Sequence, residues 1–187
     1  MNPMGRMESV SIEMPKNEIH SSIESVDAEK LDAKIKLDKS GMLPRHGGEW
    51  TGEPGDSIWN PDKNVEPGDR NGTNPENKTW GEILAQYKIE GIQFNNGEPD
   101  FSEVAKGTVE IDDFSDDRAS NFDQADEKMA EQRGCSPEEV AKWRKESGYT
   151  WHECRDCATM LKVPTEVHGN ISHSGGVSEY KNQNNIC

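Results

Sequence analysis

Apolar residues recur at helical spacing in four segments of this chain. The amphipathic stretch closest to the start is weak, and the three later segments have clear end signals. Thr79 with Glu82, and Ser136 with Glu139, have the spacing of a capping box, in which each side chain bonds the backbone N–H of the other residue. The pattern therefore predicts helices over 26–37, 79–87, 116–132 and 137–148.

Short apolar runs bounded by Gly, Pro and Asn predict strands between and after these helices. A turn over 95–99 follows the first strand, and Pro164 is expected to open a short helix that carries His168. The last two strands and this helix then form a strand–turn–strand–helix unit. The expected strands cover 92–94, 107–111, 149–153 and 159–163.

Residues 41–78 hold twelve Gly and Pro residues, which favours a loop without regular structure. Trp50 and Trp59 lie inside this segment, and two Trp residues are unusual in a disordered linker. We therefore expect the loop to pack on a neighbouring domain.

Composition limits the size of the core. Only 30% of the 187 residues are hydrophobic, which argues against one large core and for a compact domain with polar flanks. The expected organisation is a polar N-terminal segment over 1–40, a Gly/Pro-rich linker over 41–78 and a domain over 79–187. No apolar run approaches the roughly 20 residues that span a bilayer, and the first 20 residues have no apolar segment of a classical signal peptide.

The charge is unevenly distributed. The formal net charge is -15, and residues 48–117, with 5 basic and 17 acidic side chains, contribute -12 of it. Such a chain lacks the basic surface of a general nucleic-acid-binding protein.

Three of the five His residues fall within 22 positions: His152, His168 and His173. The first lies on an expected strand, and the other two flank the end of the expected short helix. This arrangement suits one divalent cation held from the helix side, with the strand His activating water as a base. A general base must be unprotonated near pH 7 to accept a proton, and imidazole meets this condition.

Two cysteines offer a different interpretation. Cys154 and Cys157 form a CxxC, and with His168 and His173 they approach the order of a two-Cys two-His zinc site. The gap before the first His is shorter than the usual ~12 residues of a DNA-reading finger. The CxxC alone is open to three readings: zinc ligands, a disulfide or two packed thiols.

A segment of 28 residues near the C-terminus, 149–176, resembles a known superfamily. The segments that show the resemblance are Tyr149-Thr-Trp-His-Glu-Cys154, Thr159-Met-Leu-Lys-Val-Pro-Thr-Glu-Val-His168 and His173-Ser-Gly-Gly176. They are similar to bacterial HNH/endonuclease-seven nucleases, in particular the polymorphic-toxin branch with a Trp-His-His signature. The segment Gly97-Glu-Pro-Asp-Phe-Ser102 also resembles what precedes this motif, and 41–78 resembles a pre-toxin linker.

The resemblance implies an α+β fold with a small, treble-clef-like ββα-metal core over about 149–176, preceded by helices and a short β-hairpin. It implies that His152 is the catalytic residue that activates water, and that His168 and His173 are metal ligands. Glu153 replaces the second His of the signature; its carboxylate would bind the metal or leave the site one ligand short. Adjacent strand residues point to opposite faces, so His152 and Glu153 share a metal only on a kinked strand. Arg155, Lys162 and Arg118 are candidate phosphate contacts.

The implied function is a metal-dependent endonuclease with Zn, Mg or Mn, with DNA favoured over RNA as substrate. A toxin of this kind is a secreted antibacterial effector that acts in the target-cell cytoplasm and is neutralised by a cognate immunity protein. Two alternatives stay open from the sequence. One is a non-catalytic zinc-binding module that uses Cys154, Cys157, His168 and His173. The other is a degenerate nuclease, suggested by Glu153.

Overall fold

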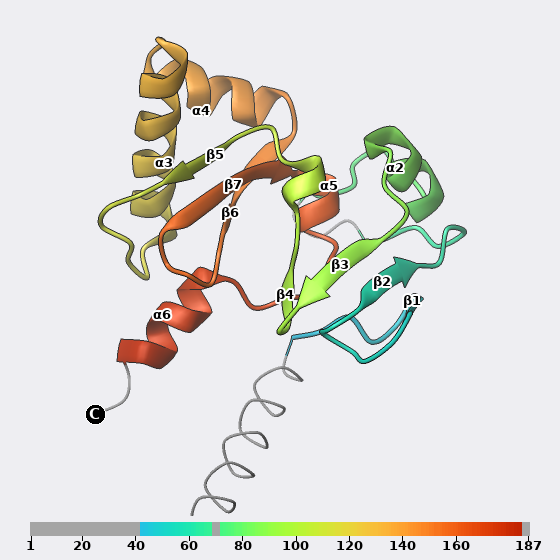
Figure 1. The fold of residues 1–187 in the computed structure, drawn as a ribbon. Coiled ribbons are helices and arrows are strands. Elements are labelled where there is room, and N and C mark those ends of the chain that lie inside the picture. The colour runs from blue at the N-terminus through green and yellow to red at the C-terminus, as the bar shows by residue number, and fades with distance from the viewer. Residues whose placement is uncertain (1–41, 69–71, 185–187) are drawn as a thin grey trace, which may run out of the picture. The chain divides into compact units, whose positions relative to one another are not determined.

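The computed structural model describes residues 42–68 and 72–184 (Figure 1). The expected amphipathic stretch over 26–37 lies outside the described residues. Within the described part of the chain, seven strands form two small antiparallel sheets and are accompanied by five α-helices. The α+β class expected from the sequence is confirmed.

The first sheet has the strand order β1-β2-β3-β4. Its strands are β1 (Gly48–Trp50), β2 (Ile58–Pro61), β3 (Ile92–Asn95) and β4 (Glu98–Pro99). Helix α2 (Trp80–Tyr87) packs on it, with Trp80, Ile83 and Leu84 buried in the same cluster as Trp59 and Phe94.

The first two strands correct the expectation that 41–78 has no regular structure. Trp50 lies opposite Trp59 across the strand pair, with ring centroids 5.3 Å apart, and the Trp50 ring meets Phe94 edge-on at 4.9 Å. Cross-strand aromatic pairs of this kind stabilise a sheet. The expectation that this segment packs on the domain is confirmed, and its Gly and Pro residues fall mainly in the turns and loops outside these two strands.

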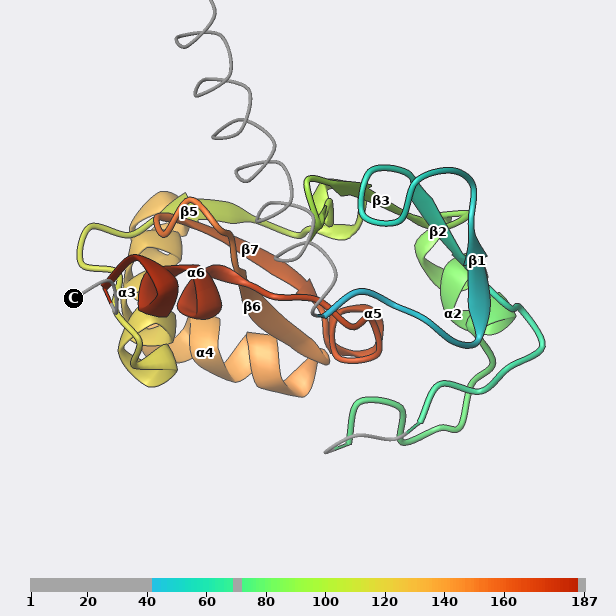
Figure 2. The ribbon, with the colours of Figure 1, turned by 90° about the horizontal axis from the view of Figure 1, so that it is seen from below.

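The second sheet has the order β5-β7-β6, formed by β5 (Thr108–Glu110), β7 (Thr159–Pro164) and β6 (Tyr149–Glu153). Helices α3 (Arg118–Arg133) and α4 (Pro137–Glu146) cover one face of this sheet (Figure 2). A second hydrophobic cluster fills the space between them; its buried members are Val109, Ile111, Ala125, Met129, Ala130, Val140, Trp151 and Met160.

The ends of α2, α3 and α4 lie within two residues of the predicted ones. Both capping boxes form, Thr79 with Glu82 at α2 and Ser136 with Glu139 at α4. Gly134 ends α3 in the left-handed region at φ 67°, a conformation that favours glycine.

Helix α5 (Thr165–His168) follows β7 directly and lies between the two sheets (Figures 1 and 2). Val167 on α5 and Ile171 beyond it are buried in the core of the first sheet. Helix α6 (Gly176–Asn184) comes next, and the sequence pattern did not predict it. Its residue Tyr180 packs near Phe114, with ring centroids 5.8 Å apart.

Successive side chains of β6 point to opposite faces of the sheet, one toward α3 and α4 and the other toward α5. Trp151 turns toward the helices, where its Nε1–H donates to Asp126 Oδ1 at 2.8 Å. Arg144 donates to both oxygens of the same carboxylate, at 3.1 and 2.6 Å. His152, one residue later, therefore points to the opposite face, toward α5.

No helix in the described part of the chain combines the length and the apolar character needed to cross a membrane.

Candidate metal centre

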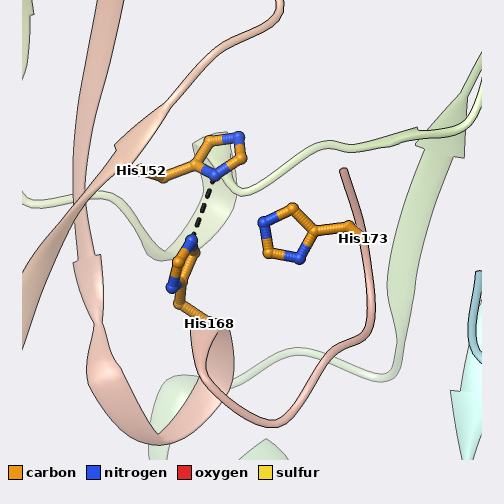
Figure 3. Close-up of side chains that lie close together, drawn as sticks. All are labelled: His152, His168 and His173. Atoms are coloured by element: carbon orange, nitrogen blue, oxygen red, sulfur yellow. Dashed lines mark hydrogen bonds between the residues drawn. The ribbon is translucent and has the colours of Figure 1, made fainter. Parts of the chain in front are cut away.

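Three imidazole rings meet beside the end of α5 (Figure 3). His152 comes from β6, His168 is the last residue of α5, and His173 lies in the loop before α6. Nδ1 of His152 is 3.2 Å from Nε2 of His168. One ligand nitrogen from each ring lies within 4.8 Å of the other two. Ligands of one zinc ion, at about 2.0–2.1 Å from the metal, lie about 3.3 Å apart. The His152–His168 pair has this spacing, and side-chain movements of about 1 Å would bring His173 to a shared cation.

The backbone fixes the orientation of His173. Its Nδ1 lies 2.8 Å from the carbonyl oxygen of Ile171. A carbonyl only accepts, so this contact is a hydrogen bond when Nδ1 carries the proton. Nε2 then keeps its lone pair, and Figure 3 shows the other ring nitrogen of His173 turned toward His152 and His168. Metal-ligating His residues usually have such a second partner.

Burial keeps the three rings neutral. It lowers the pKa of His152 to about 3, with smaller contributions from His173 and Arg118. Burial likewise lowers the pKa of His168 and of His173 below the usual imidazole value. The ring of Phe101, only 1% exposed, packs against all three, with centroids 5.0, 5.5 and 5.6 Å away. Neutral imidazoles in a partly apolar pocket are suited to Zn²⁺ and similar cations, whereas Mg²⁺ prefers oxygen ligands.

Side-chain hydrogen bonds hold α5 in place. Glu166, two residues before His168, accepts from Tyr87 Oη and Gln86 Nε2, both at 2.6 Å, and forms an ion pair with Lys78 at 3.2 Å. Burial, and then the bond to Glu166, raise the pKa of Tyr87 so that it stays a donor. These contacts tie α5 to α2 and thereby position His168.

Glu153 does not join the three His residues. As strand alternation predicts, its buried carboxylate points toward α3, where it accepts from Arg118 Nε at 3.0 Å and Asn121 Nδ2 at 2.9 Å. The Arg118 side chain is 64% exposed, and its charge contributes to the lowered pKa of each of the three imidazoles. Arg118 is therefore an accessible cation beside the cluster, held by Glu153.

The other two candidate phosphate contacts are differently placed. Lys162 is 1% exposed, and its Nζ lies over the Trp143 ring, 4.7 Å from the centroid, on the helix-covered face of the sheet. The Arg155 guanidinium is bound to Glu179 at 2.8 Å and to the carbonyl of Asn96 at 2.9 Å. Neither cation is presented to the histidine cluster, because each is committed to packing or to another partner.

The two-Cys two-His arrangement does not assemble in the described part of the chain. Cys154 lies with Glu98 and His152, and Cys157 belongs to no potential metal-ligand group there. The Cys157 thiol is instead 3.6 Å from the carbonyl of Gly176, and both cysteines are free thiols. Burial raises the pKa of Cys154 to about 12.

Sequence reasoning did not identify Glu98 and Phe101 as site residues. Glu98 Oε1 lies 3.9 Å from Nε2 of His152 and accepts from the backbone N–H of Arg155 at 2.7 Å. The signal available was the resemblance of segment 97–102 to toxin sequences. That signal did not identify the role of either side chain, since the contact depends on β4 lying near β6.

A comparison with protein families matches residues 91–175 to the model of the DNase/tRNase domain of colicin-like bacteriocins. Among curated proteins, none matches the chain. The matched segment covers less than half of the chain and includes all three His residues, Arg118 and Glu153. It supports the interpretation of this region as a nuclease domain of a bacterial toxin. The part of the chain that carries the histidine cluster is thus similar to the DNase/tRNase domain of colicin-like bacteriocins.

Proposed function

We propose that this chain is a metal-dependent, HNH-type endonuclease, with its reaction centre at His152, His168 and His173. The observation that carries the proposal is the convergence of three neutral imidazole nitrogens, within 4.8 Å of one another, beside an exposed arginine. The similarity of residues 91–175 to a bacteriocin nuclease domain gives this geometry a substrate class, nucleic acid.

His152 is proposed as a metal ligand and not as the base expected from the sequence. Its Nδ1 faces Nε2 of His168 at a ligand-like distance of 3.2 Å. A base would instead direct its free nitrogen at an attacking water, yet the other nitrogen of His152 is buried and faces Glu98. The donor set fits a cation that prefers nitrogen ligands, and we favour Zn²⁺ over Mg²⁺ or Mn²⁺. A divalent cation bound there would neutralise charge on the scissile phosphate and promote ionisation of water.

Arg118 is the proposed phosphate contact. Glu153 holds its Nε, and no described residue accepts a hydrogen bond from its two Nη atoms. A guanidinium fixed at one side in this way keeps donors for a phosphodiester oxygen. Glu153 thus takes the part of a positioning residue for Arg118 and not that of a metal ligand.

We further propose DNA over RNA as the substrate and an antibacterial toxin as the biological role. A secreted effector of this kind acts in the cytoplasm of the target cell. The producing cell then needs an immunity protein, because its own nucleic acid carries the same phosphodiester bonds.

The test is cleavage of plasmid DNA and of total RNA by the purified full chain with Zn²⁺, Mn²⁺, Mg²⁺ or no metal. His168→Ala and His173→Ala are the informative variants, and His46→Ala, an exposed His outside the site, is the matched control. Metal-dependent cutting that EDTA, His168→Ala and His173→Ala abolish, and that His46→Ala retains, supports the proposal.

Absence of cutting by all folded samples would overturn the nuclease proposal and favour the degenerate alternative. Cutting that survives both site variants would locate the chemistry elsewhere. The non-catalytic zinc module with Cys154, Cys157, His168 and His173 gains no support from the geometry, since the two cysteines and these two His residues form no common group among the described residues.

A further inference from the structure

The second ring nitrogen of His152 makes no hydrogen bond to any residue that the structure describes. This atom, Nε2, is fully buried, and the side chain is 1% exposed. A buried polar atom without a partner is costly and needs an explanation. This nitrogen points away from His168 and toward Glu98, whose Oε1 is 3.9 Å away.

Glu98, His152 and Cys154 surround this position. One ligand atom from each lies within 4.8 Å of the other two. The three residues come from different places in the fold, β4 for Glu98, β6 for His152 and the turn after β6 for Cys154. Neither the sequence pattern nor the CxxC spacing indicates this group, because β4 and β6 belong to different sheets.

A small cavity opens beside two of the three residues. It has a volume of about 280 Å³, and Glu98 and Cys154 line it, whereas the buried ring of His152 lies behind them. Asp100 and Asp156 also line it, which makes the entrance acidic and attractive to cations. Neither His168 nor His173 lines this cavity.

We propose that Glu98, Nε2 of His152 and Cys154 Sγ form a second metal site, for a thiophilic divalent cation of the Zn²⁺ type. Carboxylate oxygen, imidazole nitrogen and thiolate sulfur are the three protein ligands of zinc, whereas Mg²⁺ and Ca²⁺ avoid sulfur. Ligands of one tetrahedral zinc lie about 3.3–3.7 Å apart, so side-chain movements of about 1 Å suffice. Binding releases the Cys154 thiol proton to solvent, and water from the cavity fills the fourth position.

This site is distinct from the three-histidine centre and does not depend on the proposed nuclease activity, but both use one ring. A neutral imidazole has one lone-pair nitrogen and one N–H. A cation at Nε2 and a cation at Nδ1 therefore compete for neutral His152. Loading of the Glu98–Cys154 side withdraws His152 from His168 and His173.

The experiment is titration of the full chain with Co²⁺, a spectroscopic substitute for Zn²⁺, followed by absorption. Coordination by a thiolate gives a near-ultraviolet sulfur-to-cobalt band, which an all-imidazole site lacks. We expect this band in the unmodified chain and in the double variant His168→Ala/His173→Ala. It should disappear in Cys154→Ser and remain in Cys157→Ser, the matched control three residues away.

A measurement on the unmodified chain covers the case in which Cys154→Ser does not fold. Zn²⁺ should slow alkylation of Cys154 on the order of tenfold or more, and EDTA should reverse this, since a metal-bound thiolate is shielded. Cys157 and Cys135 serve as internal references. Absence of the cobalt band together with unprotected Cys154 would overturn the second site and leave the three-histidine centre standing. A band lost in Cys157→Ser instead would also overturn it. Cobalt bound without a sulfur band would overturn the site as well, even where Glu98→Gln weakens the binding, because Glu98 would then act only by orienting His152.

Discussion

Arg118 donates from Nε to the buried carboxylate of Glu153 at 3.0 Å, across 35 positions of the chain. This contact explains two features together. It shows that the Glu153 carboxylate, which the sequence resemblance aligns with the second His of the signature, points toward α3, and it holds an exposed guanidinium beside the three imidazoles. In the proposed site, the side chain that the sequence suggested as a metal ligand positions a candidate phosphate contact.

The first prediction concerns this pair. Arg118→Ala should lower the cleavage rate by about 10²-fold, the usual cost of removing one group that stabilises transition-state charge. Glu153→Gln should lower it less, because the amide still accepts a hydrogen bond while the charge is gone. Lys142→Ala, on the exposed surface of α4, is the control. Steady-state kinetics of the two single variants and the double variant provide the check.

In the double variant, Glu153→Gln should add little to Arg118→Ala, since a positioning residue acts only through the residue that it positions. Additive losses would contradict this arrangement and give Glu153 a role of its own.

The second prediction is acid destabilisation of the metal-free protein. The pKa of His152 is about 3 in the folded state, and that of an unfolded His is about 6.5. Between these values the unfolded chain binds the proton and the folded chain does not, so the free energy of unfolding falls as pH falls. Each such residue contributes up to about 1.4 kcal/mol per pH unit. Urea unfolding at pH 7 and pH 5 measures it.

His168 and His173, with pKa values also lowered by burial, act in the same direction. His168→Ala should therefore flatten the pH dependence. A stability that rises on acidification to pH 5 would show that the rings are charged in the folded state.

The third prediction concerns the buried Asp126 carboxylate, which pairs with Arg144 and accepts the hydrogen bond of Trp151. The Asp126 side chain is 4% exposed and pairs at 2.6 Å with Arg144, whose side chain is 8% exposed. Asp126→Ala leaves Arg144 buried without its counter-charge and removes the acceptor of Trp151 Nε1–H, so it should destabilise the fold by about 3–5 kcal/mol. Lys63→Ala breaks the exposed pair with Glu90 and should cost less than about 1 kcal/mol. Urea midpoints compare the two, and equal costs would contradict the buried role.

The fourth prediction concerns the tie between α2 and α5. Tyr87→Phe removes the 2.6 Å hydrogen bond to Glu166 and should destabilise the protein by about 1.5–3 kcal/mol, because the acceptor is a partly buried carboxylate. It should also weaken metal binding, since Glu166 and His168 share α5. Tyr180→Phe on α6 is the matched control. Calorimetric titration with Zn²⁺ measures the affinity, and an unchanged affinity would mean that α5 does not need this tie.

The fifth prediction is stabilisation by metal. A ligand that binds only the folded state at 100 times its Kd adds about 2.7 kcal/mol. Zn²⁺ should therefore raise the Tm of the unmodified chain and of His46→Ala, and EDTA should reverse the rise. The rise should shrink in His173→Ala. Thermal scans in which His173→Ala and the unmodified chain respond alike would exclude the three-histidine centre as the dominant site.

Several elements were determined by local sequence. The capping boxes at Thr79 and Ser136, and Gly134 after α3, act over one helical turn, so the helices form as predicted. The alternation along β6 also follows from neighbours alone, and it correctly separated His152 from Glu153. The three clustered His residues and the resemblance around them indicated the region of the candidate site before any fold was known.

Other features depend on contacts between distant segments, which local pattern does not encode. Strands β1 and β2 form in a Gly/Pro-rich segment because Trp50 and Trp59 pair with each other and pack on Phe94. The sequence suggests that Lys162 is a surface cation, yet in the folded sheet its Nζ packs over the ring of Trp143.

The chemistry divides in the same way. The sequence by itself determined which residue types are present and that His152, His168 and His173 lie near one another along the chain. Only the tertiary structure decided that Arg118 meets Glu153 and that Glu98 faces the far nitrogen of His152. The physical reason is that hydrogen bonds and metal sites need atoms within a few ångströms, and chain packing brings residues 35 and 54 positions apart to that distance.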